Sequence, residues 1–88
     1  MISQKQVKSL HLRKYRSLNN QFIVEGSRSI SSAIDAKARI DSVFYTLDFS
    51  KKNPTILEKL NKIPSEIVSS KEIRKLSPSA NPSGILAT

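Results

Sequence analysis

The sequence lacks cysteine and tryptophan and has only two glycines and one histidine among 88 residues. Without cysteine the chain forms no disulfide, thiolate metal site or cysteine nucleophile, and we expect a reducing, cytoplasmic environment. The two glycines, Gly26 and Gly84, lie too far apart for a dinucleotide-binding fingerprint or a phosphate-binding P-loop. No apolar run approaches the roughly 20 residues that span a bilayer, so we expect no membrane partner.

Residues suited to catalysis are also scarce. The seven acidic residues are scattered, without the spacing of a metal site or of an acid/base pair. The single histidine, His11, lies in a basic segment, where a surface role is commoner than that of a general base. We therefore expect the chain alone to be non-catalytic and to bind neither a metal nor a cofactor.

Positive charge is abundant and unevenly distributed. The net charge is +8, of which residues 1–20 contribute +5, residues 21–50 contribute −1 and residues 51–88 contribute +4. Such asymmetry favours a face for nucleic acid or another anionic surface. Two alternatives remain open at this point: an ordinary solvated surface, and an organellar transit peptide in the acid-free N-terminal segment.

Apolar periodicity predicts helices alternating with short strands. We expect a helix from Ser3 to about Leu12, with Ile2, Val7 and Leu10 turned inward. A polar loop over residues 13–21 should follow. The later elements should be a buried strand Phe22–Val24, a helix begun by Ser27, a strand Ser42–Thr46, a helix begun by Asn53-Pro54 and ended by Pro64, a strand Glu66–Val68, a helix capped by Ser70, and a strand Gly84–Thr88.

This order predicts an α/β fold, a small three-layer α/β/α sandwich with a mostly parallel four-stranded sheet. With 88 residues it should form one domain with a modest core, since a chain of this size buries about 60–65% of its unfolded surface. The chain stops on an apolar strand, so we interpret residues 1–88 as an N-terminal domain excised from a longer protein.

The basic residues are the candidates for RNA binding, because arginine and lysine contact phosphates and aromatic rings stack on unpaired bases. Tyr15 lies among them as a possible stacking surface, or else it covers the edge of the core. Glu25 and Gly26 are expected to shape a turn before a helix. The predicted RNA-binding residues are Lys5, Lys8, Arg13, Lys14, Arg16, Arg28, Lys71, Arg74 and Lys75.

Several segments together resemble one known family. They are Val7-Lys8, Arg13-Lys14-Tyr15-Arg16, Phe22-Ile23-Val24-Glu25-Gly26-Ser27-Arg28, Ser42-Val43-Phe44-Tyr45-Thr46, Lys75-Leu76-Ser77 and Asn81-Pro82-Ser83-Gly84-Ile85-Leu86-Ala87. In order and spacing they are similar to the N-terminal substrate-binding domain of SpoU/TrmH-type RNA ribose methyltransferases. The family's usual threonine before the proline is absent, since Ser79-Ala80-Asn81 precedes Pro82.

The resemblance implies a fold like that of kink-turn-binding ribosomal proteins. It also implies a trefoil-knot catalytic domain after residue 88, which would bind S-adenosylmethionine, form a homodimer and methylate a ribose 2′-hydroxyl, with ribosomal RNA (23S) favoured over transfer RNA. The isolated domain should be monomeric. Position by position, Lys8, Arg16, Glu25, Gly26 and Arg28 match the family's pattern. Two alternatives remain: a stand-alone RNA-binding protein of ribosomal type, and a basic protein-interaction module.

Overall fold

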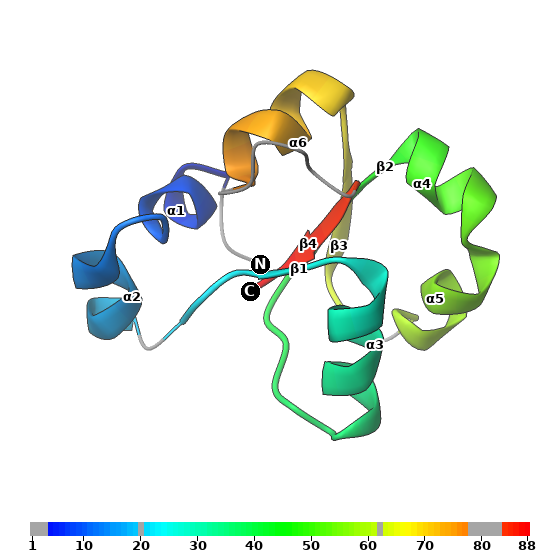
Figure 1. Cartoon of the computed structure of the whole chain (residues 1–88), viewed down its shortest axis with the longest axis horizontal. Coiled ribbons are helices and arrows are strands. Elements are labelled where there is room, and N and C mark those ends of the chain that lie inside the picture. Colours follow the sequence, from blue (N-terminus) through cyan, green and yellow to red (C-terminus); the bar gives the residue numbers. More distant parts are fainter. Residues whose placement is uncertain (1–3, 20, 62, 78–83) are drawn as a thin grey trace.

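The computed structural model describes residues 4–19, 21–61, 63–77 and 84–88. A four-stranded sheet lies at the centre of the molecule, with helices against both of its faces (Figure 1). The strands run in the order β1-β4-β2-β3 across the sheet. Their bounds are β1 Val24–Glu25, β2 Val43–Thr46, β3 Ser65–Val68 and β4 Ile85–Ala87. The three-layer α/β architecture predicted from the sequence is therefore confirmed.

The prediction of a mostly parallel sheet is wrong in one respect, because the sheet is mixed. Strands β2 and β3 are parallel, whereas β4 runs antiparallel to both β1 and β2. The period of two in a strand determines which side chains are buried, but it carries no information about the direction of the chain. Strand β4 inserts between β1 and β2, so the last strand in the sequence occupies a central position.

Two apolar cores form, one on each face of the sheet. Along β4, Ile85 and Ala87 join one core while Leu86 joins the other, and all three are buried. Strand β2 divides in the same way, with Val43 on the first face and Phe44 on the second. This alternation follows from the pleat, which points successive side chains to opposite faces. Both central strands therefore hold the two helical layers together.

Helices α1 (Gln4–Ser9), α2 (Arg13–Asn19) and α6 (Ser70–Leu76) lie on one side of the sheet (Figure 1). The buried side chains that α1 and α6 contribute to this side are Val7, Ile73 and Leu76. The inward positions predicted for Val7 and Leu10 are confirmed, since both are buried. Ile2 and Ser3 lie outside the described residues. We call this side the α1/α2/α6 layer.

Helices α3 (Ser27–Asp35), α4 (Leu47–Lys52) and α5 (Pro54–Lys59) cover the opposite face. Their core residues are Ile30, Phe49, Ile56 and, directly after α5, Leu60. The predicted helix after Asn53-Pro54 is confirmed, although it ends at Lys59 rather than at Pro64. We call this side the α3/α4/α5 layer. Within the described ranges no helix combines the length and apolar character needed to cross a bilayer.

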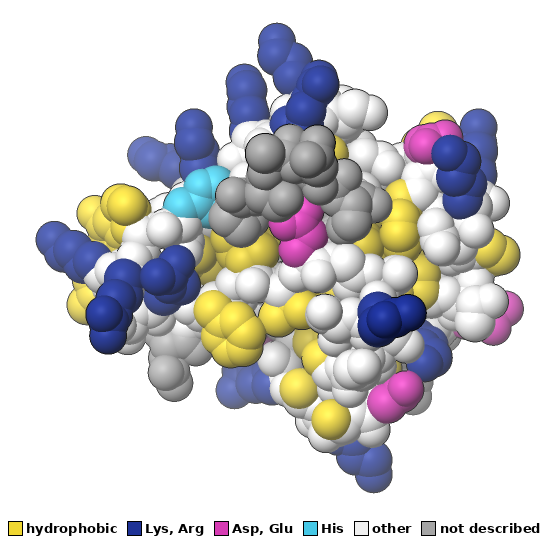
Figure 2. All heavy atoms as spheres, in the orientation of Figure 1, with side chains coloured by type: hydrophobic (Ala, Val, Ile, Leu, Met, Phe, Trp, Pro, Cys, Tyr) yellow, Lys and Arg dark blue, Asp and Glu magenta, His cyan; other side chains and the backbone are white. Residues whose placement is uncertain are grey.

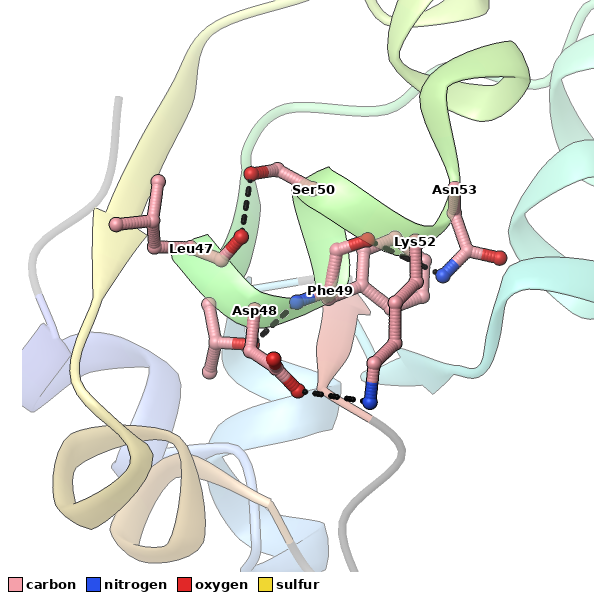
Figure 3. A network of polar contacts seen from close by, with 7 residues as sticks. Leu47, Asp48, Phe49, Ser50, Lys52 and Asn53 are labelled. Atoms are coloured by element: carbon pink, nitrogen blue, oxygen red, sulfur yellow. Dashed lines mark hydrogen bonds and ion pairs between the residues drawn. The ribbon is translucent and has the colours of Figure 1, made fainter.

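Helix α4 was not predicted. Figure 3 shows the hydrogen bonds made at its two ends. The backbone N–H of Phe49 donates to Thr46 Oγ1 at 3.1 Å, so Thr46 caps the helix directly after β2. At the other end Asn53 Nδ2 donates to the carbonyl of Phe49 at 3.1 Å. Asn53 therefore ends α4 with its side chain, and it makes no side-chain cap to α5, which it precedes.

Four further local predictions are corrected. The first helix ends at Ser9, and the predicted loop over residues 13–21 contains α2 instead. Arginine, lysine and leucine are good helix formers, and this local preference outweighs the polar character of the segment. The predicted buried strand shifts to Val24–Glu25 at the edge of the sheet, which leaves Phe22 65% exposed. The cap of α6 is Ser69, one residue before the predicted Ser70.

Gly84 leads the chain into β4 in a conformation that glycine adopts readily. Its φ is 94°, and a Cβ built there would lie 3.2 Å from the Cβ of Phe49. Its carbonyl accepts from the backbone N–H of Thr46 at 3.0 Å. A side chain at this position would therefore meet both backbone strain and the packed α4.

Candidate nucleic-acid interface

Helices α1 and α6 are joined by side chains that hold their outer surfaces side by side. Gln4 Nε2 donates to Glu66 in β3 at 3.0 Å and to Glu72 in α6 at 2.9 Å. His11 Nε2 lies 2.7 Å from the carbonyl oxygen of Leu76. Because a carbonyl can only accept, His11 donates this bond. His11 thus makes a structural contact at the C-terminal end of α6.

Glu72, which accepts from Gln4 of α1, also takes part in the N-terminal cap of α6. Its carboxylate accepts from the backbone N–H of Ser69 at 2.9 Å, and Ser69 Oγ accepts from the N–H of Glu72 at 3.0 Å. These two bonds form a capping box. The hydrogen bond from the Ser69 backbone, followed by that from the Gln4 amide, lowers the pKa of Glu72 from its ordinary value of 4.5.

Five of the predicted cations project from these two joined helices, and all five are exposed. On α1, Lys5 and Lys8 are three residues apart and so share its outer face. On α6 the three cations are spaced three and four residues apart, so they share the face opposite to the buried Ile73 and Leu76. The five cations are Lys5, Lys8, Lys71, Arg74 and Lys75.

Three more predicted cations lie on α2. Arg13 and Lys14 are exposed, and the Lys14 Nζ lies 5.8 Å from the centre of the Tyr15 ring. Arg16 is half-buried, and its Nη1 donates to the carbonyls of Leu10 and His11, each at 3.3 Å. Arg16 therefore stabilises the corner between α1 and α2, while its remaining donors are left for a phosphate.

Figure 2 shows these basic side chains as dark-blue projections over α1, α2 and α6. The three ion pairs formed among described residues all lie in the other layer or in the loop that leads from α3 to β2: Lys52–Asp48, Lys59–Asp35 and Arg39–Asp41. In the part of the chain that the structure describes, the cations of the α1/α2/α6 layer thus form no ion pair with a carboxylate. This layer carries most of the uncompensated charge.

Arg28 is not brought together with the other predicted cations. It is exposed in the first turn of α3, in the opposite layer. It lines a shallow hollow with Lys52 and Lys59, which are paired with Asp48 and Asp35. The charge around Arg28 is therefore partly compensated.

The Glu25-Gly26 pair lies where β1 turns into α3. Gly26 has a φ of 97°, and it precedes the helix without any side-chain cap. Ser27 is the first residue of α3, as predicted. Glu25 accepts from the hydroxyl of buried Ser77, with its two oxygens 2.7 and 2.8 Å from Ser77 Oγ. Glu25 thereby connects β1 to the C-terminal end of α6.

The described residues contain no cluster of three or more histidines and acids that could hold a metal ion. The sequence prediction did not identify one surface feature, the row of Leu12, Tyr15 and Leu18 along α2. All three are exposed, and their spacing of three residues would have revealed a helical face. The segment Asn81-Pro82-Ser83, which contributed to the family resemblance, lies outside the described residues.

Comparison with known proteins identifies the family of the chain. A family model described as the MRM3-like substrate binding domain matches residues 3–87. A protein of Synechocystis sp. described as an uncharacterized tRNA/rRNA methyltransferase is 28% identical over 86 residues. That alignment covers 96% of this chain but 31% of the relative, so the chain spans less than a third of that protein's length.

Solved structures of methyltransferases share the fold. The structure of an RNA 2′-O ribose methyltransferase superimposes with a TM-score of 0.75 at 26% identity, covering 96% of this chain and 32% of that one. An rRNA methyltransferase from Sinorhizobium meliloti gives 0.76 at 20% identity, covering 96% and 31%. The SpoU methyltransferase AviRb from Streptomyces viridochromogenes, solved with AdoMet, gives 0.74 at 19%, covering 96% and 33%. The family resemblance drawn from the motifs is thus confirmed, and the chain belongs to the MRM3-like substrate binding domain family.

Proposed function

We propose that this chain is the RNA-recognition domain of an S-adenosylmethionine-dependent ribose 2′-O-methyltransferase that acts on ribosomal RNA, with 23S rRNA as the favoured substrate. Support comes from the family match over residues 3–87 and from relatives described as tRNA/rRNA and RNA 2′-O ribose methyltransferases. In this proposal a catalytic domain follows residue 88, forms a homodimer in the cytoplasm, and performs the methyl transfer. The present domain binds RNA and presents it to that partner domain.

The observation that carries the proposal is the unpaired charge of the α1/α2/α6 layer. Eight cations project from three neighbouring helices, while the acids Glu66 and Glu72 beside them are engaged by Gln4. Phosphates have a regular spacing, and a row of cations held on packed helices can neutralise several of them at once. The cations are Lys5, Lys8, Arg13, Lys14, Arg16, Lys71, Arg74 and Lys75.

The domain's own part in the reaction is to bind and orient the RNA. Helices α1 and α6 share the core of Phe44 and Leu86, and this rigid support fixes the distance between their cations. Contacts to phosphate and sugar position a nucleic acid without reading its sequence. We therefore assign to the α1/α2/α6 layer the role of orienting the RNA. The choice of RNA sequence is assigned to contacts with the bases.

The cofactor is assigned to the catalytic domain and not to this one. When bound by the catalytic domain, that cofactor supplies the methyl group.

The test is the affinity of this chain for a structured ribosomal-RNA fragment and for a matched DNA duplex at several salt concentrations. Four to six phosphate contacts predict a slope of about −3 to −5 for log K against log salt. We expect RNA to bind more tightly than the duplex DNA, with that steep slope. Equal and weak binding to both, with a shallow slope, would contradict a recognition role for this domain.

A further inference from the structure

Helix α2 presents an apolar stripe to solvent. Leu12 lies directly before the helix, and Tyr15 and Leu18 lie within it, each three residues further on. This spacing places the three side chains on one helical face. Their exposed fractions are 58%, 38% and 70%. No described side chain of α2 is buried, so the stripe contributes little to the cores that stabilise the fold.

Cations border this stripe on both sides. Lys14 and Arg16 precede and follow Tyr15 in the helix, so they lie on opposite sides of the apolar face. Lys14 Nζ lies 5.8 Å from the centre of the Tyr15 ring. Neither α1 nor α2 contains an acidic residue. The surface therefore combines an aromatic ring, two aliphatic side chains and uncompensated positive charge, and it fits a ligand with flat apolar faces and negative charge.

We propose that this stripe is a stacking surface for unpaired nucleotides, so that the domain selects single-stranded loops over continuous RNA duplex. The inference rests on the proposed function and specifies which part of the RNA meets α2. An unpaired nucleotide offers an exposed base face for Tyr15 and a phosphate for the neighbouring cations. Leu12 and Leu18 bracket the ring and extend the apolar contact to the adjacent base or ribose.

The other occupants fit this surface less well. In an A-form duplex the base faces are stacked inside the helix, so a duplex would cover the stripe with phosphates and hydroxyls. A second copy of this chain would bring two acid-free, cationic helices together, and like charges facing each other oppose association. An acidic protein would complement the positive charge of this surface but not its apolar stripe.

The first experiment compares two RNA probes, a single-stranded oligouridylate and an RNA duplex of equal length. The test variant Tyr15→Ser/Leu18→Ser removes apolar surface without changing charge. The matched control Leu47→Ser/Ile67→Ser removes two side chains that are 54% and 56% exposed on α4 and β3. Since none of the four residues is buried, circular dichroism should show that all variants fold.

We expect the α2 variant to lose about tenfold or more in affinity for the oligouridylate, because a stacked base contributes about 1–3 kcal/mol. Its affinity for the duplex should change less than about twofold, since phosphate contacts remain. The Leu47/Ile67 control should resemble wild type with both probes. Tyr15→Phe, which keeps the ring, should bind like wild type. Equal losses for both probes, or no loss for either, would overturn the stacking proposal.

A spectroscopic readout separates stacking from simple charge attraction. The chain has no tryptophan and two tyrosines, Tyr15 and Tyr45. In a Tyr45→Phe background, emission comes from Tyr15 alone, and a stacked uracil should quench it. Poly-glutamate, which has charge but no bases, should leave the emission unchanged. Quenching by poly-glutamate, or a lack of quenching by oligouridylate under saturating conditions, would instead indicate an acidic-protein surface and contradict the proposal.

Failure of this inference can be told apart from failure of the proposed function. The variant Lys71→Gln/Arg74→Gln/Lys75→Gln removes charge from α6 and leaves the stripe intact. If it weakens binding of both probes while the stripe variants have no effect, the domain binds RNA but not by stacking on α2. If neither set of variants changes binding, the recognition function itself is wrong.

Discussion

The two helical layers of this domain differ in how their charged side chains are paired. In the α3/α4/α5 layer, Lys52 and Lys59 are paired with Asp48 and Asp35. In the α1/α2/α6 layer the described cations form no ion pair with a carboxylate, and Glu72 accepts hydrogen bonds from Gln4 and Ser69, while nearby Lys75 lowers its pKa further. Paired charges stabilise a protein only slightly when exposed, whereas unpaired ones of a single sign attract an anion. The contrast makes the α1/α2/α6 layer the candidate surface for an anionic partner.

The largest expected effect concerns the core beneath the cationic layer. Phe44 is 1% exposed and packs with Leu86 under α1 and α6. Phe44→Ala should lower the free energy of unfolding by about 3–5 kcal/mol, through lost burial and the cavity left behind. Ile85→Ala, on the other face, should cost about 2–5 kcal/mol. Urea denaturation measures both. If Phe44→Ala left stability unchanged, the two cores would not contribute equally, and the shared-sheet description would be wrong.

The second prediction compares the removal of positive charge from each of the two layers. Neutralising Lys71, Arg74 and Lys75 together should reduce RNA affinity about tenfold or more and make the salt slope shallower by about 2–3. Neutralising Lys51, Lys52 and Lys59, which removes the same charge from the other layer, should change affinity much less. Fluorescence anisotropy across a salt series measures both variants. Equal losses from the two triple variants would show that net charge alone governs binding.

A third prediction concerns the contact that joins the cationic layer to the edge strand. Ser77 is 5% exposed and donates its hydroxyl to Glu25. Ser77→Ala should lower the free energy of unfolding by about 1–3 kcal/mol, because a half-buried carboxylate then loses a donor. Thermal denaturation of Ser77→Ala beside Ser50→Ala provides the comparison, since Ser50 donates locally to the carbonyl of Leu47 in α4. A larger loss for Ser50→Ala would indicate that the link between α6 and β1 is unimportant.

The smallest expected effect is a pH dependence within the cationic layer. The folded state lowers the pKa of Glu72 below its ordinary value of 4.5, chiefly through the Ser69 backbone. Its contribution to stability is therefore complete above pH 4.5 and is lost as the pH falls through the lower, folded pKa. Glu72→Gln should flatten that acid limb of the stability curve, measured by urea denaturation at successive pH values.

Sequence patterns predicted the buried faces well, and they predicted chain direction poorly. Val7 and Leu10 are buried where their spacing required, because helical period alone determines which side faces the core. The antiparallel course of β4 depends on which strands become neighbours, a long-range choice that no local period records. Helix α4 was overlooked because its cap, Thr46, is also the last residue of a strand.

The candidate site was predicted in composition but not in arrangement. The cations of α1 and α6 were identified by charge, yet their proximity depends on Gln4 reaching Glu66 and Glu72 from the opposite end of the chain. Arg28 belongs to the same family motif as Glu25 and lies in the other layer. The stripe along α2 was overlooked because a polar segment was interpreted as a loop, although Leu12, Tyr15 and Leu18 had helical spacing.

No described side chain of α2 is buried, and this has a consequence for how the molecule opens. A helix without core contacts can unfold locally, and its amides should exchange with deuterium without waiting for the whole domain. Ile85, Leu86 and Ala87, buried in β4, should exchange only through global unfolding. The surface proposed to meet unpaired RNA would thus lie on a helix that opens more readily than β4. Its ordering on contact would then make the binding rate, more than the stability of the fold, sensitive to the sequence of α2.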